Sequence, residues 1–169
     1  MSAVTRVGVV GPGQMGCGFA EVCARAGTDV VVVASGEASA ERGRRRLEKS
    51  LDRLLGKGKI SVDERAETVA RVAFSWDLGV LEDREFVLEA TPEDLDRKLA
   101  VFAALDEVVS ESDAVLASTT SALPIMKLGR ATRDPGRVLG VHLFNPVQVM
   151  PLVELISSLA TAPTTAERA

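Results

Sequence analysis

The chain has 169 residues, of which 46% are hydrophobic and 26% are charged, and its formal net charge is −4. This length is typical of one domain with a core of its own, and the small negative charge gives no reason to expect nucleic acid or an anionic membrane as a partner. No apolar run approaches membrane-spanning length, and no signal peptide precedes the first predicted strand.

The first predicted element is an apolar strand that runs into a glycine-rich turn. Residues 7–10 are mostly valine and lead into the spacing Gly-x-Gly-x-x-Gly at residues 11–16. Residues 19–27 then have the spacing of a helix that ends at its last glycine, and a second apolar run follows at 29–34. The predicted apolar face of this helix consists of Phe19, Val22, Cys23 and Ala26. A strand, a glycine turn, a helix and a strand in this order are the context that a dinucleotide-binding fingerprint requires.

Each glycine of the turn has a separate expected role. Gly11 makes the tight turn, Gly13 lets the backbone approach a pyrophosphate, and Gly16 lets the helix and the strand pack closely. The helix N-terminus offers free N–H groups and a partial positive charge to the phosphates. An ordinary glycine-rich turn is the alternative, and the flanking elements favour dinucleotide binding.

Both cysteines, Cys17 and Cys23, fall in this first predicted helix. They are too few and too badly placed for a disulfide framework or a zinc site, so we predict no metal. Reduced thiols would fit a cytoplasmic protein.

The end of the second predicted strand departs from the usual NAD-binding pattern. An acidic residue is expected there, because its carboxylate accepts hydrogen bonds from the adenosine ribose and repels a 2′-phosphate. Ala34 stands at that position, followed by Ser35, and Glu37 comes three positions late. The change weakens the ribose contact, transfers it to Ser35 or Glu37, or relaxes discrimination against NADP. Arg42 and residues 44–46 could serve a 2′-phosphate, although we favour a solvated basic helix face for them.

Two helices and a strand are predicted next. Residues 38–55 have the leucine spacing of a long helix, and the Gly-Lys-Gly-Lys run at 56–59 should end it. Residues 61–64 have the pattern of a capping box that opens a short helix. Residues 72–74 are the third predicted strand.

The strand predicted at 86–90 leads toward a possible ligand site. Thr91 has the character of an N-cap and Pro92 that of a first helical residue, so we expect a helix from there through Val109. Glu93 and Lys98 would lie in its first turns, at the carboxyl edge of the sheet where ligands bind in open α/β folds. Helix capping and solvation are the alternative role for both residues.

Polar residues follow the last predicted strands. Four hydroxyl residues, 118–121, follow the strand at 113–117, and turns and caps are their common use. The strand at 138–141 ends on His142, the only histidine. The strand at 152–156 holds Glu154 among apolar residues, which is costly unless that carboxylate has a partner. His142 is the obvious candidate.

Together these elements predict an α/β fold, namely a Rossmann-type doubly wound, mainly parallel sheet with helices on both faces. Residues 1–160 would form this dinucleotide-binding domain, and residues 161–169 the start of a truncated helix or a tail.

From Arg6 to about Thr161 the chain resembles the N-terminal domain of the 3-hydroxyacyl-CoA dehydrogenase family. The most specific parts of the resemblance are residues 7–16, 89–98, 117–123 and 142–154. The resemblance implies NAD as the cofactor, with NADP possible because of Ala34, and an acyl-CoA or another acyl thioester as the substrate.

The resemblance also implies roles for individual residues. His142 matches the catalytic base, Glu154 the residue that holds it, and Ser121 a serine that contacts substrate and cofactor. Ser50 and Lys57 match positions that contact coenzyme A. The expected cofactor-binding residues, from the glycine motif, the second strand end and the resemblance together, are Gly11, Pro12, Gly13, Gln14, Met15, Gly16, Ser35, Glu93, Lys98, Ser121 and Asn145.

Two further departures from the family pattern stand out. Thr119 replaces an asparagine in the usual Ser-Asn-Thr-Ser run. The family continues into a helical C-terminal domain that completes the acyl pocket and forms the dimer, whereas this chain stops at Ala169. A truncated chain, a shortened gene product, or a subunit that needs a homodimer or a separate helical partner would each explain the end.

The mechanism we expect is hydride transfer between a nicotinamide and C3 of a 3-hydroxyacyl thioester. His142 would take and return the hydroxyl proton, because imidazole changes charge near neutral pH. Glu154 would fix its tautomer, and Ser121 would hold the substrate oxygen. One alternative is a non-catalytic or partner-dependent dinucleotide-binding domain. Another is the same chemistry on an acyl group bound to a carrier protein.

Overall fold

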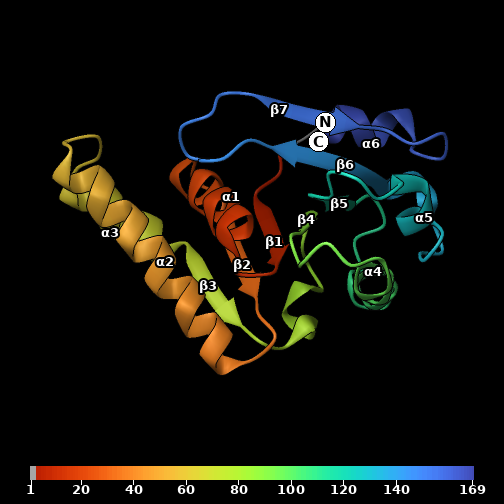
Figure 1. The fold of residues 1–169 in the computed structure, drawn as a ribbon, viewed down its shortest axis with the longest axis horizontal. Coiled ribbons are helices and arrows are strands. Elements are labelled where there is room, and N and C mark those ends of the chain that lie inside the picture. The colour runs from red at the N-terminus through yellow and green to blue at the C-terminus, as the bar shows by residue number, and fades with distance from the viewer. Residues whose placement is uncertain (1–2) are drawn as a thin grey trace.

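The computed structural model describes residues 3–169 and contains a seven-stranded sheet in the order β3-β2-β1-β4-β5-β6-β7 (Figure 1). The strands are β1 (Arg6–Val10), β2 (Asp29–Val33), β3 (Val72–Ser75), β4 (Phe86–Glu89), β5 (Val115–Ser118), β6 (Val138–Leu143) and β7 (Val153–Ile156). β1 to β6 pair in parallel, and β7 is antiparallel to β6. The predicted Rossmann-type, mainly parallel sheet is confirmed.

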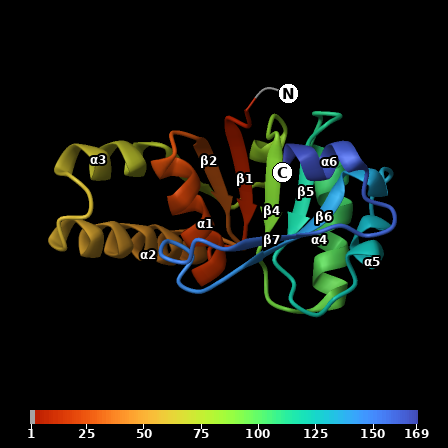
Figure 2. The ribbon, with the colours of Figure 1, turned by 90° about the horizontal axis from the view of Figure 1, so that it is seen from above.

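Helices cover both faces of this sheet, with α1 to α3 on one side and α4 and α5 on the other (Figure 2). The α-helices are α1 (Gln14–Arg25), α2 (Glu37–Gly56), α3 (Val62–Ala70), α4 (Leu95–Val108), α5 (Ile125–Gly129) and α6 (Pro163–Arg168), and the 3-10 helices are η1 (Leu78–Leu81) and η2 (Pro135–Arg137). The predicted capping box is confirmed, because Ser61 and Glu64 each accept a hydrogen bond from the other's backbone N–H at the start of α3.

The core consists of two apolar layers separated by the sheet. Successive strand residues point to opposite faces, so Val9 packs in the layer under α1 and α2 while its neighbour Val10 packs in the layer with α4. Because both faces are covered, β1, β2 and β4 are nearly continuous apolar runs rather than alternating patterns. The two layers hold the strand ends, and therefore the site, in fixed positions.

The buried face of α1 differs from the predicted one. Of the four predicted residues, Phe19 and Cys23 do pack against the core, whereas Val22 and Ala26 are exposed. Cys17, Ala20 and Ala24 are the fully buried apolar residues of the helix. Small side chains occupy the fully buried positions because α1 packs closely on β1 after the glycine turn. The predicted helix end is confirmed, since α1 ends at Arg25 and the glycine after it has a positive φ of 96°.

The start of α4 also differs from the prediction. Thr91 is not an N-cap, because its backbone N–H and its hydroxyl both donate to the Glu89 carboxylate. Asp94 caps the helix instead and accepts from the backbone N–H of Arg97 at 2.8 Å. Glu93 therefore lies in the loop before α4, and Lys98 lies in the helix.

The end of the described chain packs against the start of β6. Thr165 of α6 is buried, and its hydroxyl donates to the Gly136 carbonyl at 2.8 Å. The division into residues 1–160 and 161–169 stays a prediction, although the expected helix is present from Pro163. Within residues 3–169 no helix is both long and apolar enough to cross a membrane.

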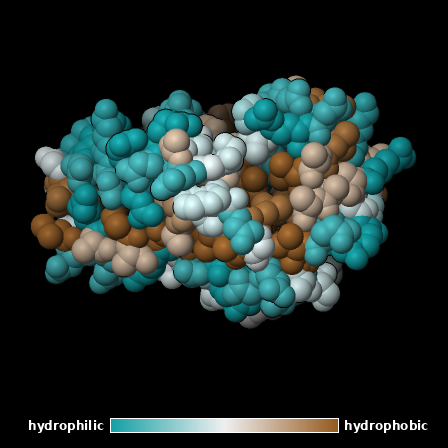
Figure 3. Space-filling model, turned by 90° about the horizontal axis from the view of Figure 1, so that it is seen from below, coloured by the Kyte–Doolittle hydropathy of each residue, from teal (hydrophilic) through white to brown (hydrophobic). Residues whose placement is uncertain are grey.

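Hydrophobic residues gather on part of the molecular surface. Figure 3 shows a band of hydrophobic surface between hydrophilic areas on one face of the molecule.

Cys17 and Cys23 are free, and burial raises the pKa of both thiols, that of Cys23 to about 12. Both thiols are therefore protonated and unreactive near neutral pH.

Candidate active site

A groove of about 970 Å³ runs along the carboxyl edge of the sheet. The parallel register brings the ends of β1, β4 and β5 together, because Val10 lies opposite Glu89 and Glu89 lies opposite Ser118. The groove is bordered on one side by residues 11–15 of the glycine turn and on the other by residues 90–92 and Thr119. This is the edge at which open α/β folds bind ligands.

The glycine turn has the geometry that its expected roles require. Gly11 has a φ of 111°, and its N–H donates to the Val33 carbonyl at 2.8 Å, which ties β1 to β2. A Cβ on Gly16 would overlap the Gly11 carbonyl oxygen, so α1 packs directly on the turn. A Cβ on Gly13 would meet only the Ala90 oxygen, at 3.9 Å, and no described side chain caps the helix that Gly13 opens. The turn therefore leaves backbone open toward the groove.

These contacts predict different consequences for two alanine substitutions. Gly16→Ala should destabilise the fold, because the added methyl group collides with backbone that cannot move aside. Gly13→Ala should leave thermal stability nearly unchanged and weaken dinucleotide binding, because its methyl group occupies the open approach. Thermal melts and calorimetric titrations of both variants measure this. Equal loss of stability in both would contradict these roles.

A buried charge network lies directly behind the groove. Glu89 and Lys98 are both fully buried, and the Lys98 ammonium donates to the two carboxylate oxygens of Glu89 at 2.9 and 2.8 Å. Ser118 donates to the same carboxylate at 2.6 Å, and Thr91 donates twice. The network fixes the loops that leave β4 and β5. Glu89 is a site residue that the sequence analysis did not single out. Its place at the end of a buried apolar strand could have indicated it, because a carboxylate there needs a hydrogen-bonding or cationic partner.

Glu93 links this network to the hydroxyl-rich loop. Its carboxylate accepts from the Thr120 hydroxyl and lies 3.5 Å from the Lys98 ammonium. Partial burial opposes ionisation of Glu93, but the Thr120 hydrogen bond and the Lys98 charge outweigh it, so the pKa of Glu93 lies below its usual value. Lys98 itself is fully buried, and neither it nor Glu93 lines the groove.

The hydroxyls of the loop after β5 divide between structural and open positions. Ser118 and Thr120 stabilise turns, as predicted for this run: the Thr120 N–H donates to the Ser118 hydroxyl at 3.2 Å, and the Leu123 N–H donates to the Thr120 hydroxyl at 2.9 Å. Ser121 instead is exposed and lines a small pocket of about 280 Å³.

His142 and Glu154 meet in that same pocket. They lie opposite each other in the register of β6 and β7, and Nδ1 of the imidazole is 2.8 Å from Oε2 of the carboxylate. A carboxylate accepts only, so the neutral ring carries its proton on Nδ1 and presents Nε2 as an acceptor. The predicted contact between the two side chains is confirmed. Their side chains are 30% and 53% exposed, so the pocket is open to water.

Asn145 and Ser50 connect neighbouring parts of the molecule. The Gln14 amide donates to Asn145 at 2.8 Å and so joins the glycine turn to the loop after His142. Gln148 of that loop donates to the Ser50 hydroxyl at 3.3 Å, and both line a hollow of about 450 Å³. Lys57 caps the far end of α2, outside that hollow.

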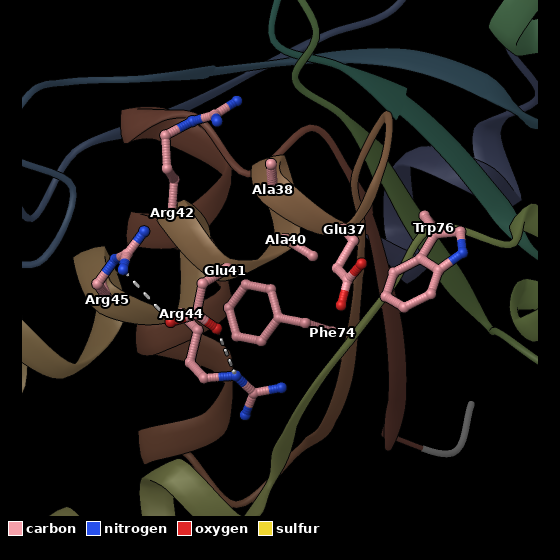
Figure 4. A pocket seen from close by; sticks show the side chains of 9 residues that line it. All are labelled: Glu37, Ala38, Ala40, Glu41, Arg42, Arg44, Arg45, Phe74 and Trp76. Atoms are coloured by element: carbon pink, nitrogen blue, oxygen red, sulfur yellow. Dashed lines mark ion pairs between the residues drawn. The ribbon is translucent and has the colours of Figure 1, made fainter.

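A further hollow of about 730 Å³ lies beside the start of α2 (Figure 4). Glu37 directs its carboxylate between the rings of Phe74 and Trp76 (Figure 4). Glu37 lines this hollow but not the groove, whereas Ser35 lines the groove. Ser35 and Glu37 were the two possible replacements for the missing acid, and of these only Ser35 lines the groove.

Known proteins share both the sequence and the fold of this chain. A family profile described as "3-hydroxyacyl-CoA dehydrogenase, NAD binding domain" matches residues 6–169. A 3-hydroxybutyryl-CoA dehydrogenase of Mycobacterium tuberculosis is 52% identical over 98% of this chain and 58% of its own length. The crystal structure of FadB2 from the same organism has a TM-score of 0.98 at 51% identity, over 99% of this chain and 59% of that chain.

A more distant solved structure gives the same picture. The (S)-3-hydroxybutyryl-CoA dehydrogenase of Ralstonia eutropha has a TM-score of 0.93 at 39% identity, over 96% of this chain and 57% of that chain. The chain thus spans less than two thirds of the length of each of these relatives.

Proposed function

Because the chain belongs to the 3-hydroxyacyl-CoA dehydrogenase family, we propose that it carries the nicotinamide-binding part of an enzyme that transfers a hydride to or from C3 of a 3-hydroxyacyl thioester. The observation that supports the chemistry is the His142–Glu154 pair, 2.8 Å apart in the pocket that Ser121 also lines. A base, a group that orients the base and a hydroxyl donor at one sheet edge are what alcohol oxidation requires.

In this proposal His142 is the general base. Its Nε2 removes the proton of the 3-hydroxyl as the carbonyl forms, and returns the proton when the reaction runs toward the alcohol. Glu154 holds the Nδ1 proton and stabilises the imidazolium that results. Ser121 donates to the substrate oxygen and so places C3 for transfer. The nicotinamide, when bound, supplies the hydride chemistry.

The residues at the groove fit a nicotinamide dinucleotide. The open backbone at Gly13 and the uncapped start of α1 would hold the diphosphate, since both offer N–H groups and a positive dipole end. We propose the remaining residues of the turn, with Ser35, Glu93, Ser121 and Asn145, as further contacts. Lys98 acts on the cofactor only through Glu93, because its ammonium is buried.

The acyl thioester is proposed as an acyl-CoA, in line with the printed names of the relatives. Ser50 and Lys57 stay proposed contacts for the carrier end of that substrate. A carrier-protein-bound acyl group remains the alternative, because both carriers present the same phosphopantetheine arm.

A second candidate function follows from the exposure of β7. Val153 and Leu155 are 51% and 45% exposed on one side of β7, and Ile156 is 39% exposed on the side of Glu154, so both sides of the strand carry uncovered apolar side chains. Water in the pocket would weaken the electrostatic terms of catalysis. The chain would then bind the dinucleotide and depend on a second copy or a helical partner for turnover.

One paired experiment tests both candidates. The chain is titrated calorimetrically with NAD⁺ and NADP⁺, and reduction of acetoacetyl-CoA by each reduced cofactor is followed by absorbance. We expect at least one dinucleotide to bind and acetoacetyl-CoA to be reduced. Binding without turnover would favour the partner-dependent candidate, and failure of both dinucleotides to bind would remove both candidates. Preferential reduction of an acetoacetyl carrier protein would overturn the acyl-CoA assignment alone.

A further inference from the structure

The groove has an unusual charge balance at the end of β2. Among residues 3–169 no aspartate or glutamate lines it, whereas three arginines do, Arg42 and Arg46 from α2 and Arg97 from α4. Ser35 and Ser39 add hydroxyls beside the two arginines of α2. We infer that the groove selects the phosphorylated dinucleotide, NADP(H), with Arg42 as the residue that binds the 2′-phosphate. This inference rests on the proposed function, because it assumes that the groove takes a nicotinamide dinucleotide.

The acid that would disfavour a 2′-phosphate is missing from the groove. Ala34 occupies the position at the end of β2 where a carboxylate would accept from the ribose and repel the phosphate. Glu37, the nearest acid along the chain, points between Phe74 and Trp76 in the neighbouring hollow (Figure 4). A 2′-phosphate therefore meets no opposing carboxylate from the lining of the groove.

Of the two arginines of α2 that line the groove, Arg42 is the one that remains available for a ligand. Arg44 and Arg45 lie 3.9 and 3.7 Å from the Glu41 carboxylate, and Arg46 donates to the Pro12 carbonyl at 2.6 Å. Arg42 has no ion-pair partner within the described part of the chain, and its side chain points away from both Glu37 and Glu41 (Figure 4). Its guanidinium is thus free to pair with an anion.

The close approach of α2 to the glycine turn places this charge at the groove. A Cβ on Gly43 would lie 2.6 Å from the Pro12 side chain, so the helix touches the turn at that residue. Arg42 and Arg46 flank that contact and therefore stand at the rim of the groove. A phosphate monoester carries nearly two negative charges at neutral pH, and arginine binds it through two parallel hydrogen bonds.

The test uses the single tryptophan, Trp76, which lines the groove, as a fluorescence reporter beside calorimetry. Four probes are titrated: NADP⁺, NAD⁺, 2′,5′-ADP and 5′-ADP. The last two lack the nicotinamide, so they isolate the contribution of the 2′-phosphate. We expect each 2′-phosphorylated probe to bind roughly tenfold or more tightly than its partner, because a hydrogen bond to a charged group contributes this much.

Three variants assign the preference to its residues. Arg42→Gln should weaken NADP⁺ binding about 10- to 100-fold and leave NAD⁺ binding unchanged. Arg45→Gln, the control, removes the same charge from the same helix at a position that does not line the groove, and should change neither. Ala34→Asp should reverse the preference by restoring the missing carboxylate.

The outcomes separate this inference from the proposed function. Tighter binding of NAD⁺ than of NADP⁺, or an equal effect of Arg42→Gln and Arg45→Gln, would overturn the inference and leave the proposed function intact. Loss of binding of both dinucleotides in the unmodified chain would overturn both.

Discussion

Replacing His142 by glutamine is expected to lower the kcat of acetoacetyl-CoA reduction by about 10²- to 10⁴-fold, the contribution of a positioned general acid or base. Glutamine keeps a polar group opposite Glu154 but cannot exchange a proton near neutral pH. The pocket of His142 shares no lining residue with the groove, so the substitution leaves the glycine turn and the groove unchanged. Steady-state kinetics and a Trp76 fluorescence titration measure the two effects side by side.

The binding measurement is the control for this variant. Dinucleotide affinity nearly equal to that of the unmodified chain would show that the substitution removed chemistry and left the fold intact. Glu154→Gln should cause a smaller loss of kcat with a changed pH profile, because it disturbs the tautomer without removing the imidazole. Undiminished turnover by His142→Gln would rule out His142 as the general base.

The pairing of His142 with Glu154 could be predicted because the chain has one histidine, at the end of the strand before the one that holds Glu154. The structure gives another reason for the pair than the expected cost of burial, since Glu154 is 53% exposed and the register of β6 and β7 sets the two residues opposite each other. The glycine turn was equally predictable, since its flanking strand and helix favour a dinucleotide-binding turn over an ordinary glycine-rich one. Both features depend on short stretches whose chemistry limits what the backbone can do.

Features that depend on which of several possible partners a side chain contacts were predicted wrongly or not at all. The Thr91–Pro92 pattern suggests a helix start, but the Thr91 hydroxyl binds Glu89, and Asp94 then caps α4. The predicted face of α1 was right for Phe19 and Cys23 and wrong for Val22 and Ala26, because the smaller Cys17, Ala20 and Ala24 occupy the fully buried positions. Only the fold shows that Glu37 turns away from the groove and that Arg42 has no acidic partner there.

The network behind the groove gives the largest expected effect on stability. Lys98→Met should lower the free energy of unfolding by about 3–5 kcal/mol, because it leaves the Glu89 charge buried without its cation. Urea unfolding at neutral pH measures this. Arg97→Met, an exposed neighbour on the same helix, is the matched control and should stay within about 0.5 kcal/mol.

A double variant separates the charge from the packing. Lys98→Met combined with Glu89→Gln removes the unpaired charge and leaves an amide whose oxygen can still accept from Thr91 and whose NH2 group can donate to the Ser118 hydroxyl. It should therefore be more stable than Lys98→Met alone, since replacing both partners of a buried pair costs less than breaking the pair. Equal stability of the single and the double variant would mean that the lysine contributes only its packing. In that case Glu93 would owe its position to Thr120 rather than to the charge behind it.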